Sequence, residues 1–170
     1  MVEDLGSEKD VVWAKAEEEV NNIIDGLGLG IDNNIKGVVA SFRVHGFPTT
    51  GSCEGHPDDK EHGNDYPWIE ICADEPDGWR ESEVVQNQWR AENLRQRSRV
   101  EELLVEFYGS RSTSNSKLIL INKGIYGAFR IQGSSIEGKS LEDPEEQHKR
   151  QLDEMNAFSD FLKEKFLSES

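Results

Sequence analysis

The sequence predicts an α+β protein with about four helices and a three- or four-stranded, mainly antiparallel sheet. Four segments repeat apolar residues at three- and four-residue steps, as helices do, and several short apolar runs are typical of strands. Two of these runs flank Asn122-Lys123-Gly124, which indicates a β-hairpin. Such short and few strands argue against a sandwich. A length of 170 residues fits a single domain.

The helical periodicity marks four segments of the chain. We expect helices over residues 8–27, 33–45, 82–108 and 144–167. Ser7 and Asp32 precede the first two as N-caps, because a short polar side chain can accept a hydrogen bond from a free N–H of the first turn. Glycines at Gly26 and Gly46 then end these helices.

The strand predictions rest on alternation and on the hairpin signal. Residues 68–72 alternate, so Ile69 and Ile71 should share the buried face. The opposite face then carries Trp68, Glu70 and Cys72. Around Lys123-Gly124 the hairpin should pair, antiparallel, residues 118–122 and 125–131.

Charge and composition exclude several classes of protein. The chain has 19 lysines and arginines against 34 aspartates and glutamates, a formal net charge of -15. This charge argues against direct nucleic-acid binding, because a protein that binds a phosphate backbone needs a positive surface. No apolar stretch approaches the roughly 18 residues of a membrane span, and two cysteines are too few for a disulfide framework. The N-terminus does not resemble a signal peptide. We expect a soluble cytoplasmic protein, flexible at residues 1–7 and 134–144.

Four arginines in the long predicted helix have two interpretations. Glutamates at positions 92, 101 and 102 favour a solvated, ion-paired face. The alternative is a patch that binds an anion. The four are Arg90, Arg95, Arg97 and Arg99.

Most residues that could carry chemistry lie in one window of 28 residues. The window holds His45, Cys53, Glu54, His56, His62, Glu70 and Cys72. Gly51 and Gly55 allow the backbone to approach a ligand or to adopt a positive φ, and a turn of this kind can point several N–H groups at an anion. The remaining histidine, His148, lies in the charged last helix, where we expect it to be solvated.

Four interpretations of this window stay open. In the first, the cysteines are buried and the polar side chains cap turns. In the second, tetrahedral zinc is held by Cys53, His56, His62 and Cys72. In the third, Cys53 is a nucleophile activated by His56 or His45. In the fourth, the loop 49–56 binds a small polar or nucleotide-like ligand.

Among the functional interpretations, the binding loop is the leading one. Its candidate ligand-binding residues are Thr49, Thr50, Ser52, Cys53, Glu54, His56, Trp68 and Glu70. A Walker-type phosphate loop is excluded, because no lysine follows the glycines. The residues do not identify a cofactor, and they leave open whether a reaction is catalysed.

The same loop carries a resemblance to known proteins. The run from Thr49 to His56 resembles the Thr-x-x-Ser-Cys-x-Gly-His turn of small bacterial and phage proteins. More distantly, it is similar to the Thr-Thr-Ser-Ser-Cys-Ser-Gly-Arg turn of the wybutosine-synthesis methyltransferase family, which acts on transfer RNA with S-adenosylmethionine. Gly51, Glu54 and His56 depart from that second turn, and the acidic surroundings would repel transfer RNA. The resemblance implies a functional site at this turn, without methyl transfer.

A second class of function follows from the charge. A strongly acidic chain can present its surface to a basic protein partner, as an inhibitor or accessory factor of a nucleic-acid-handling enzyme would. Acid clustered on one face would favour this function, whereas a cavity at Cys53 and His56 would favour ligand binding.

Overall fold

An antiparallel sheet with strand order β1-β2-β4-β3 organises the molecule. The computed structural model describes residues 7–59, 64–112, 116–134 and 143–169. Within them the strands are β1 (Thr49–Cys53), β2 (Trp68–Ile71), β3 (Leu118–Lys123) and β4 (Ala128–Gly133). All three pairings are antiparallel, and β1 and β3 are the edge strands. The hydrogen-bonding groups on the outer side of β1 therefore have no partner strand in this sheet.

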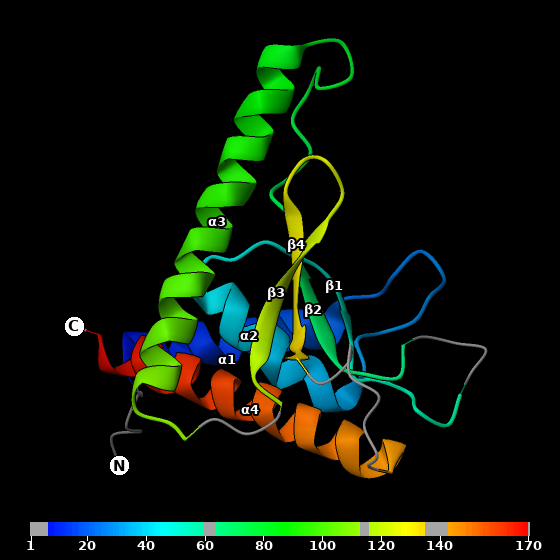
Figure 1. Cartoon of the computed structure of the whole chain (residues 1–170). Helices are drawn as coiled ribbons and strands as arrows, with labels where there is room; N and C mark the ends of the chain where they lie inside the picture. Colours follow the sequence, from blue (N-terminus) through cyan, green and yellow to red (C-terminus); the bar gives the residue numbers. More distant parts are fainter. Residues whose placement is uncertain (1–6, 60–63, 113–115, 135–142, 170) are drawn as a thin grey trace.

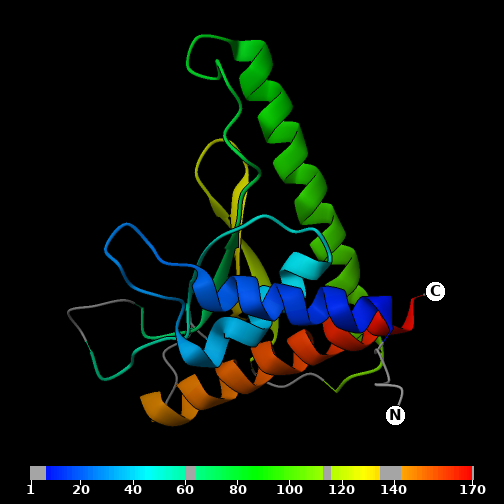
Figure 2. The same cartoon turned by 180° about the vertical axis from the view of Figure 1, so that it is seen from behind.

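The helices gather mainly on one side of this sheet. The described helices are α1 (Glu8–Asn22), α2 (Lys36–Val44), α3 (Glu83–Gly109) and α4 (Pro144–Ser168), with a 3-10 turn, η1 (Asn33–Ile35), leading into α2. Figures 1 and 2 show α1, α2 and α4 packed together on one face, while α3 stands beside the sheet and extends past the hairpin. The predicted α+β class is confirmed.

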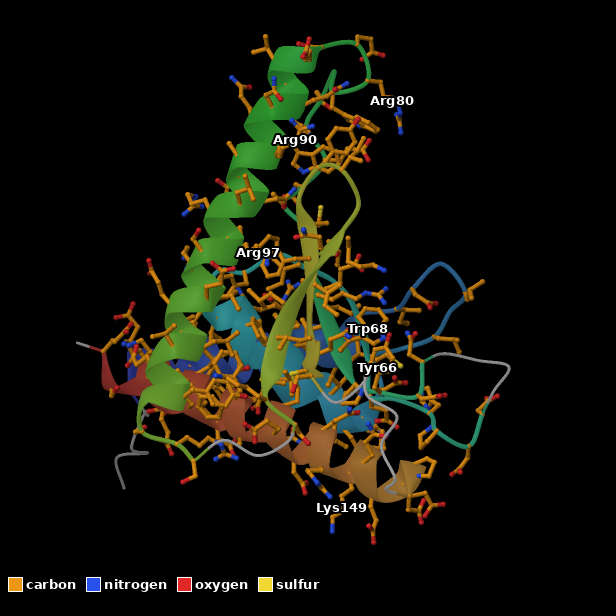
Figure 3. The ribbon with its side chains drawn as sticks, viewed as in Figure 1. Tyr66, Trp68, Arg80, Arg90, Arg97 and Lys149 are labelled. Atoms are coloured by element: carbon orange, nitrogen blue, oxygen red, sulfur yellow. The ribbon has the colours of Figure 1, made fainter. Side chains whose placement is uncertain are left out.

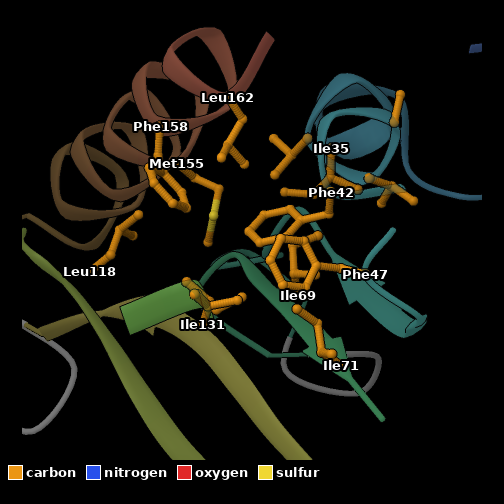
Figure 4. Packing of buried hydrophobic residues seen from close by; sticks show 14 of the residues in the cluster. Ile35, Phe42, Phe47, Ile69, Ile71, Leu118, Ile131, Met155, Phe158 and Leu162 are labelled. Atoms are coloured by element: carbon orange, nitrogen blue, oxygen red, sulfur yellow. The ribbon is translucent and has the colours of Figure 1, made fainter. Parts of the chain in front are cut away.

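The core lies between the sheet and the three clustered helices. Ile69 and Ile71 of β2 are fully buried, as their alternation predicts, and face aromatic residues from α2 and α4. In Figure 4 the rings of Phe42 and Phe158 lie over the sheet; their centroids are 5.8 Å apart in an edge-on arrangement. Such pairs are stabilising beyond the area that they bury. The apolar stripes that predicted the helices therefore meet in one core.

The first helix ends earlier than the sequence predicts. It stops at Asn22, whereas the apolar pattern continues through Ile24 and Leu27, which are 66% and 84% exposed. The Asp25 carboxylate accepts hydrogen bonds from the N–H groups of Leu27 and Leu29, at 2.8 and 2.9 Å. A short acidic side chain that satisfies nearby N–H groups stabilises a turn in competition with the helix. Residues 23–31 thus become a loop beside the sheet.

The hairpin prediction is confirmed, with its turn displaced. β3 and β4 pair antiparallel, with Lys123 opposite Ala128, so the turn comprises residues 124–127. Gly124 and Gly127 both have positive φ, at 81° and 84°, which other residues rarely adopt. The second glycine lengthens the turn beyond the Lys123-Gly124 expected from sequence.

The arginines of α3 have partners within the chain. Arg95 pairs with Glu92 at 2.6 Å and Arg97 with Glu101 at 2.9 Å. Hydrogen bonds from Arg95 and Gln96 lower the pKa of Glu92 to about 2. Guanidinium groups of the other two donate to backbone carbonyls, Arg90 to Ile125 and Arg99 to His45. In Figure 3, Arg80 and Arg90 lie at the far end of α3, well away from Trp68. The paired-face interpretation agrees with these contacts.

A buried carboxylate links α3, β3 and α4. Glu154, 3% exposed, accepts hydrogen bonds from the Tyr108 hydroxyl at 2.9 Å and from Arg111 at 2.8 Å. The Tyr108 oxygen in turn accepts the N–H of Leu118 at 2.7 Å. Burial and the bond donated to Glu154 raise the pKa of Tyr108 well above its ordinary value.

The segments expected to be flexible fall largely outside the described residues. Of the two segments, residues 1–6 and 135–142 lie outside the described part of the chain. At their borders, Ser7 caps α1 as predicted, and Asp143 accepts a hydrogen bond from Glu145 N–H at the start of α4. The Ser134 N–H donates to the Lys117 carbonyl at 2.7 Å. These bordering residues are therefore held by hydrogen bonds.

Candidate functional site

A cleft of about 670 Å³ opens along the edge strand β1. All five residues of β1 line it, together with Trp68 of β2. Its other walls come from the loop at residues 23–32 and from the segment that follows β1, including His56, Asp59 and Asn64. Most small-molecule sites have volumes of about 300–1,000 Å³. The cleft is therefore large enough for a metabolite.

Six of the eight residues predicted to bind a ligand line this cleft. They are Thr49, Thr50, Ser52, Cys53, His56 and Trp68. The Arg130 guanidinium lies over the Trp68 ring, 3.6 Å from its centroid. The indole Nε1 of Trp68 is buried without a hydrogen-bond acceptor among the described residues. Figure 3 shows Trp68 and Tyr66 close together at this end of the sheet.

The other two predicted residues support the site from outside it. The Glu54 carboxylate accepts the N–H of Asn34 at 2.9 Å, so it links η1, which leads into α2, to the end of β1. Glu70 pairs with Arg130 at 2.8 Å and is within 3.5 Å of the Thr50 hydroxyl. Neither lines the cleft, so we assign both a positioning role.

At one end of the cleft, three chemically different side chains converge. Asp32, Cys53 and His56 each direct one potential metal-ligand atom to a common region, with all three atoms within 4.8 Å of one another. His56 Nε2 lies 3.4 Å from Asp32 Oδ2. Cys53 is buried, and the other two side chains are about one-third exposed. This is the only such group among the described residues.

Asp32 does not have the capping role that the sequence predicts for it. The predicted cap of the second helix makes no side-chain capping bond. Its Oδ2 instead accepts the N–H of Glu54, at 3.1 Å, across 22 positions of sequence. A capping role and this long-range role need the same residue type in the same place, so no local signal distinguishes them. Only the folded structure, which brings the Asp32 carboxylate close to His56, identifies Asp32 as a residue of the site.

The backbone at Gly55 fixes the position of this group. Gly55 has a φ of 86°, and its N–H donates to Cys53 Sγ at 3.3 Å. One neighbour is His148, whose Nε2 donates to the Glu54 carbonyl at 2.7 Å. The expectation that His148 is solvated is therefore wrong: it reaches back from α4 to brace the turn.

Replacing Gly55 by alanine is expected to lower the free energy of unfolding by about 2 kcal/mol or more. A Cβ there would lie 2.7 Å from the Tyr66 carbonyl carbon and 2.7 Å from the His148 ring, and the positive φ adds about 1–2 kcal/mol. Gly28→Ala is the matched control, because Gly28 has a φ of 80° and nothing within 4 Å. Denaturant unfolding of both variants measures the difference. Equal losses would show that the close contacts at Gly55 do not matter.

The four residues predicted from sequence to bind zinc do not all come together, because Cys72 lies far from Cys53. Cys53 pairs with Trp68, whereas Cys72 follows the opposite end of β2, about 13 Å along the strand at about 3.3 Å per residue. Cys72 lies instead beside Asn93, and burial raises the pKa of its thiol. His62 lies outside the described residues.

The two proposed bases for a Cys53 nucleophile are separated as well. His56 belongs to the converging group. His45 instead donates from Nε2 to the Leu162 carbonyl at 2.8 Å and packs against Phe166. His45 is thus bound to α4, and His56 is the histidine available to Cys53.

The comparisons with known proteins are negative. No protein family, no curated protein and no solved structure matches the chain. The resemblance of the turn at residues 49–56 stays an expectation. None of the described helices combines the length and apolar character that crossing a bilayer requires.

Proposed function

We propose that the protein binds a small, uncharged or cationic polar molecule of the nucleoside type in the cleft beside β1. The observation that carries the proposal is the lining: a complete edge strand with three hydroxyl side chains, next to a tryptophan. Such a lining offers hydroxyl donors and acceptors along the strand edge and an aromatic side chain.

The hydroxyl groups are available to a ligand. Among the described residues, neither Thr49 nor Ser52 donates a side-chain hydrogen bond, and Thr50 has only the 3.5 Å contact with Glu70. If these hydroxyls served only to cap turns, they would be bonded to nearby backbone groups. The edge position of β1 adds backbone N–H and C=O groups that no strand uses.

The charge of the lining favours a nucleoside over a nucleotide. Asp25, Asp32 and Asp59 all line the cleft, and no lysine or arginine does so among the described residues. A phosphate group brought among carboxylates is repelled, whereas ribose hydroxyls and base nitrogens can donate to them. The charge of the cleft therefore narrows the class of ligand expected from sequence, a polar or nucleotide-like molecule, to one without a phosphate group.

The test is a binding screen with the common nucleosides and their 5′-monophosphates. We expect a nucleoside to raise the melting temperature, because a ligand that binds only the folded state adds to stability, by about 2.7 kcal/mol at 100 times Kd. Calorimetry on Ser52→Ala should then show binding weaker by about 0.5–1.5 kcal/mol, the net contribution of one hydrogen bond.

Ser98→Ala is the matched control, because Ser98 is an exposed serine on α3 that does not line the cleft. It should bind as the wild type does. Equal affinity of the Ser52 and Ser98 variants, or no thermal shift with any compound of the panel, would contradict the proposal. A monophosphate that binds more tightly than its nucleoside would contradict the charge argument.

A further inference from the structure

We infer that Asp32, Cys53 and His56 form a zinc site with three protein ligands and a fourth position open to the cleft. The inference deepens the proposed function and rests on it for the molecule that takes the fourth position. The metal itself is argued from the three side chains and their surroundings alone.

The spacing of the ligand atoms suits a tetrahedral ion. With Zn–N and Zn–O bonds of about 2.0–2.1 Å, two such ligands of a tetrahedron lie about 3.3 Å apart, and a sulfur and a nitrogen lie about 3.5 Å apart. The observed distance from His56 Nε2 to Asp32 Oδ2 is 3.4 Å. Cys53 Sγ lies within 4.8 Å of a potential ligand atom of each of the other two residues, so the three donors surround one position.

Hydrogen bonds already orient two of the three ligands. The Gly55 N–H points at Cys53 Sγ, and the preceding N–H, that of Glu54, points at Asp32 Oδ2. Outer partners of this kind hold ligands in position and tune the metal. Consecutive N–H groups directed at two potential ligand atoms also stabilise negative charge on both.

Two further hydrogen bonds hold the turn that supplies these N–H groups. His148 bonds the Glu54 carbonyl, and the Glu54 carboxylate bonds the Asn34 N–H. The loop that carries Asp32 is thus fastened to the strand that carries Cys53. A site that is preformed loses little conformational entropy when an ion binds.

The donor set selects the metal. A thiolate and an imidazole bind borderline and soft ions, whereas magnesium and calcium prefer oxygen ligands alone. Zinc with three protein ligands keeps an open position, in contrast to closed four-ligand structural sites. All three ligands line the cleft, so the open position faces its contents.

Charge links the ion to the ligand. One carboxylate and one thiolate balance Zn²⁺, so the loaded site is neutral, and a nitrogen or oxygen atom of the bound molecule can complete the coordination. The fourth ligand is therefore a donor atom of the nucleoside-type molecule, a base nitrogen or a sugar hydroxyl.

The test uses metal alone on the full chain. Metal-free protein is titrated with Co²⁺, whose thiolate complexes give a charge-transfer absorption band, and Zn²⁺ is then added to displace it. We expect one ion per chain, with the band present in wild type and in Cys72→Ala and absent in Cys53→Ala. Loss of a direct ligand in Asp32→Asn or His56→Ala should weaken zinc binding by more than the about 10–100-fold typical of outer partners.

Cys72→Ala is the matched control, since it removes the other cysteine of the chain. Circular dichroism establishes that each variant is folded, and His56→Ala keeps the test valid if Cys53→Ala does not fold. A wild type without the band, or a band that survives Cys53→Ala or disappears in Cys72→Ala, would overturn the site.

A second experiment tests the zinc site and the proposed ligand binding independently of each other. Nucleoside binding is measured with zinc and with a chelator. Cobalt binding without any nucleoside effect would refute the ligand and leave the metal site. Nucleoside binding in a protein that takes up no metal would refute the metal site and leave the ligand.

Discussion

Replacing Phe158 by alanine is expected to lower the free energy of unfolding by about 3–5 kcal/mol. Phe158 is fully buried on α4, and its ring contacts aromatic rings from two other helices, Phe42 on α2 and Phe107 on α3. Truncation removes these contacts and leaves a cavity. The three helices around it can move only partly into the space, so most of the cavity remains. At about 2–4 °C per kcal/mol for a chain of this size, the melting temperature should fall by about 10 °C.

Phe161→Ala is the control for this prediction. Phe161 is on the same helix and stacks on Phe158 with ring centroids 5.9 Å apart, but it is only partly buried. Its loss should cost clearly less, because solvent replaces part of its surroundings. If the two variants unfold at the same denaturant concentration, the core is not centred on Phe158.

Replacing Arg111 by methionine is expected to cost about 3 kcal/mol. The Arg111 side chain is 40% exposed, whereas the side chain of its partner Glu154 is only 4% exposed. Removing the positive charge leaves a buried carboxylate with the Tyr108 hydroxyl at 2.9 Å, and such an uncompensated charge is strongly destabilising. Methionine keeps much of the apolar stem that Arg111 contributes beside Phe107.

The double variant Arg111→Met with Glu154→Leu tests the reason for this loss. Replacing both members of a buried ion pair by apolar residues is often neutral, so most of the lost stability should return. Urea unfolding of the two single variants and the double variant gives the coupling energy. If the double variant is as unstable as Arg111→Met alone, loss of packing explains the effect and the charge does not.

The candidate site was predictable in part. Hydroxyl residues, a cysteine and a histidine near two glycines identified the turn at residues 49–56. Six of the eight residues predicted to bind a ligand, Trp68 included, line the cleft. Asp32 was missed, because its contact with Glu54 spans 22 positions and its local sequence looks like a helix cap. His148 was missed for the same reason, since it is 94 positions from Glu54.

The zinc set illustrates the limit of spacing arguments. Cys53 and Cys72 are near each other in sequence and suit a metal, yet antiparallel pairing of β1 with β2 puts them at opposite ends of β2. Register is set by which strand faces are buried, here through Ile69 and Ile71. The residue types indicated a metal site, but the strand register determines which of these side chains lie close together in the fold.

The sequence by itself determined the elements and the class of this protein. Periodic apolar residues predicted four helices, alternation predicted β2, and the glycine-containing hairpin predicted β3 with β4, because these signals act over a few residues. The tertiary structure alone decided the strand order, the cleft beside edge strand β1 and the meeting of Asp32 with Cys53 and His56. Those features depend on contacts between distant segments, which form only when the shared core is buried and which no local pattern encodes.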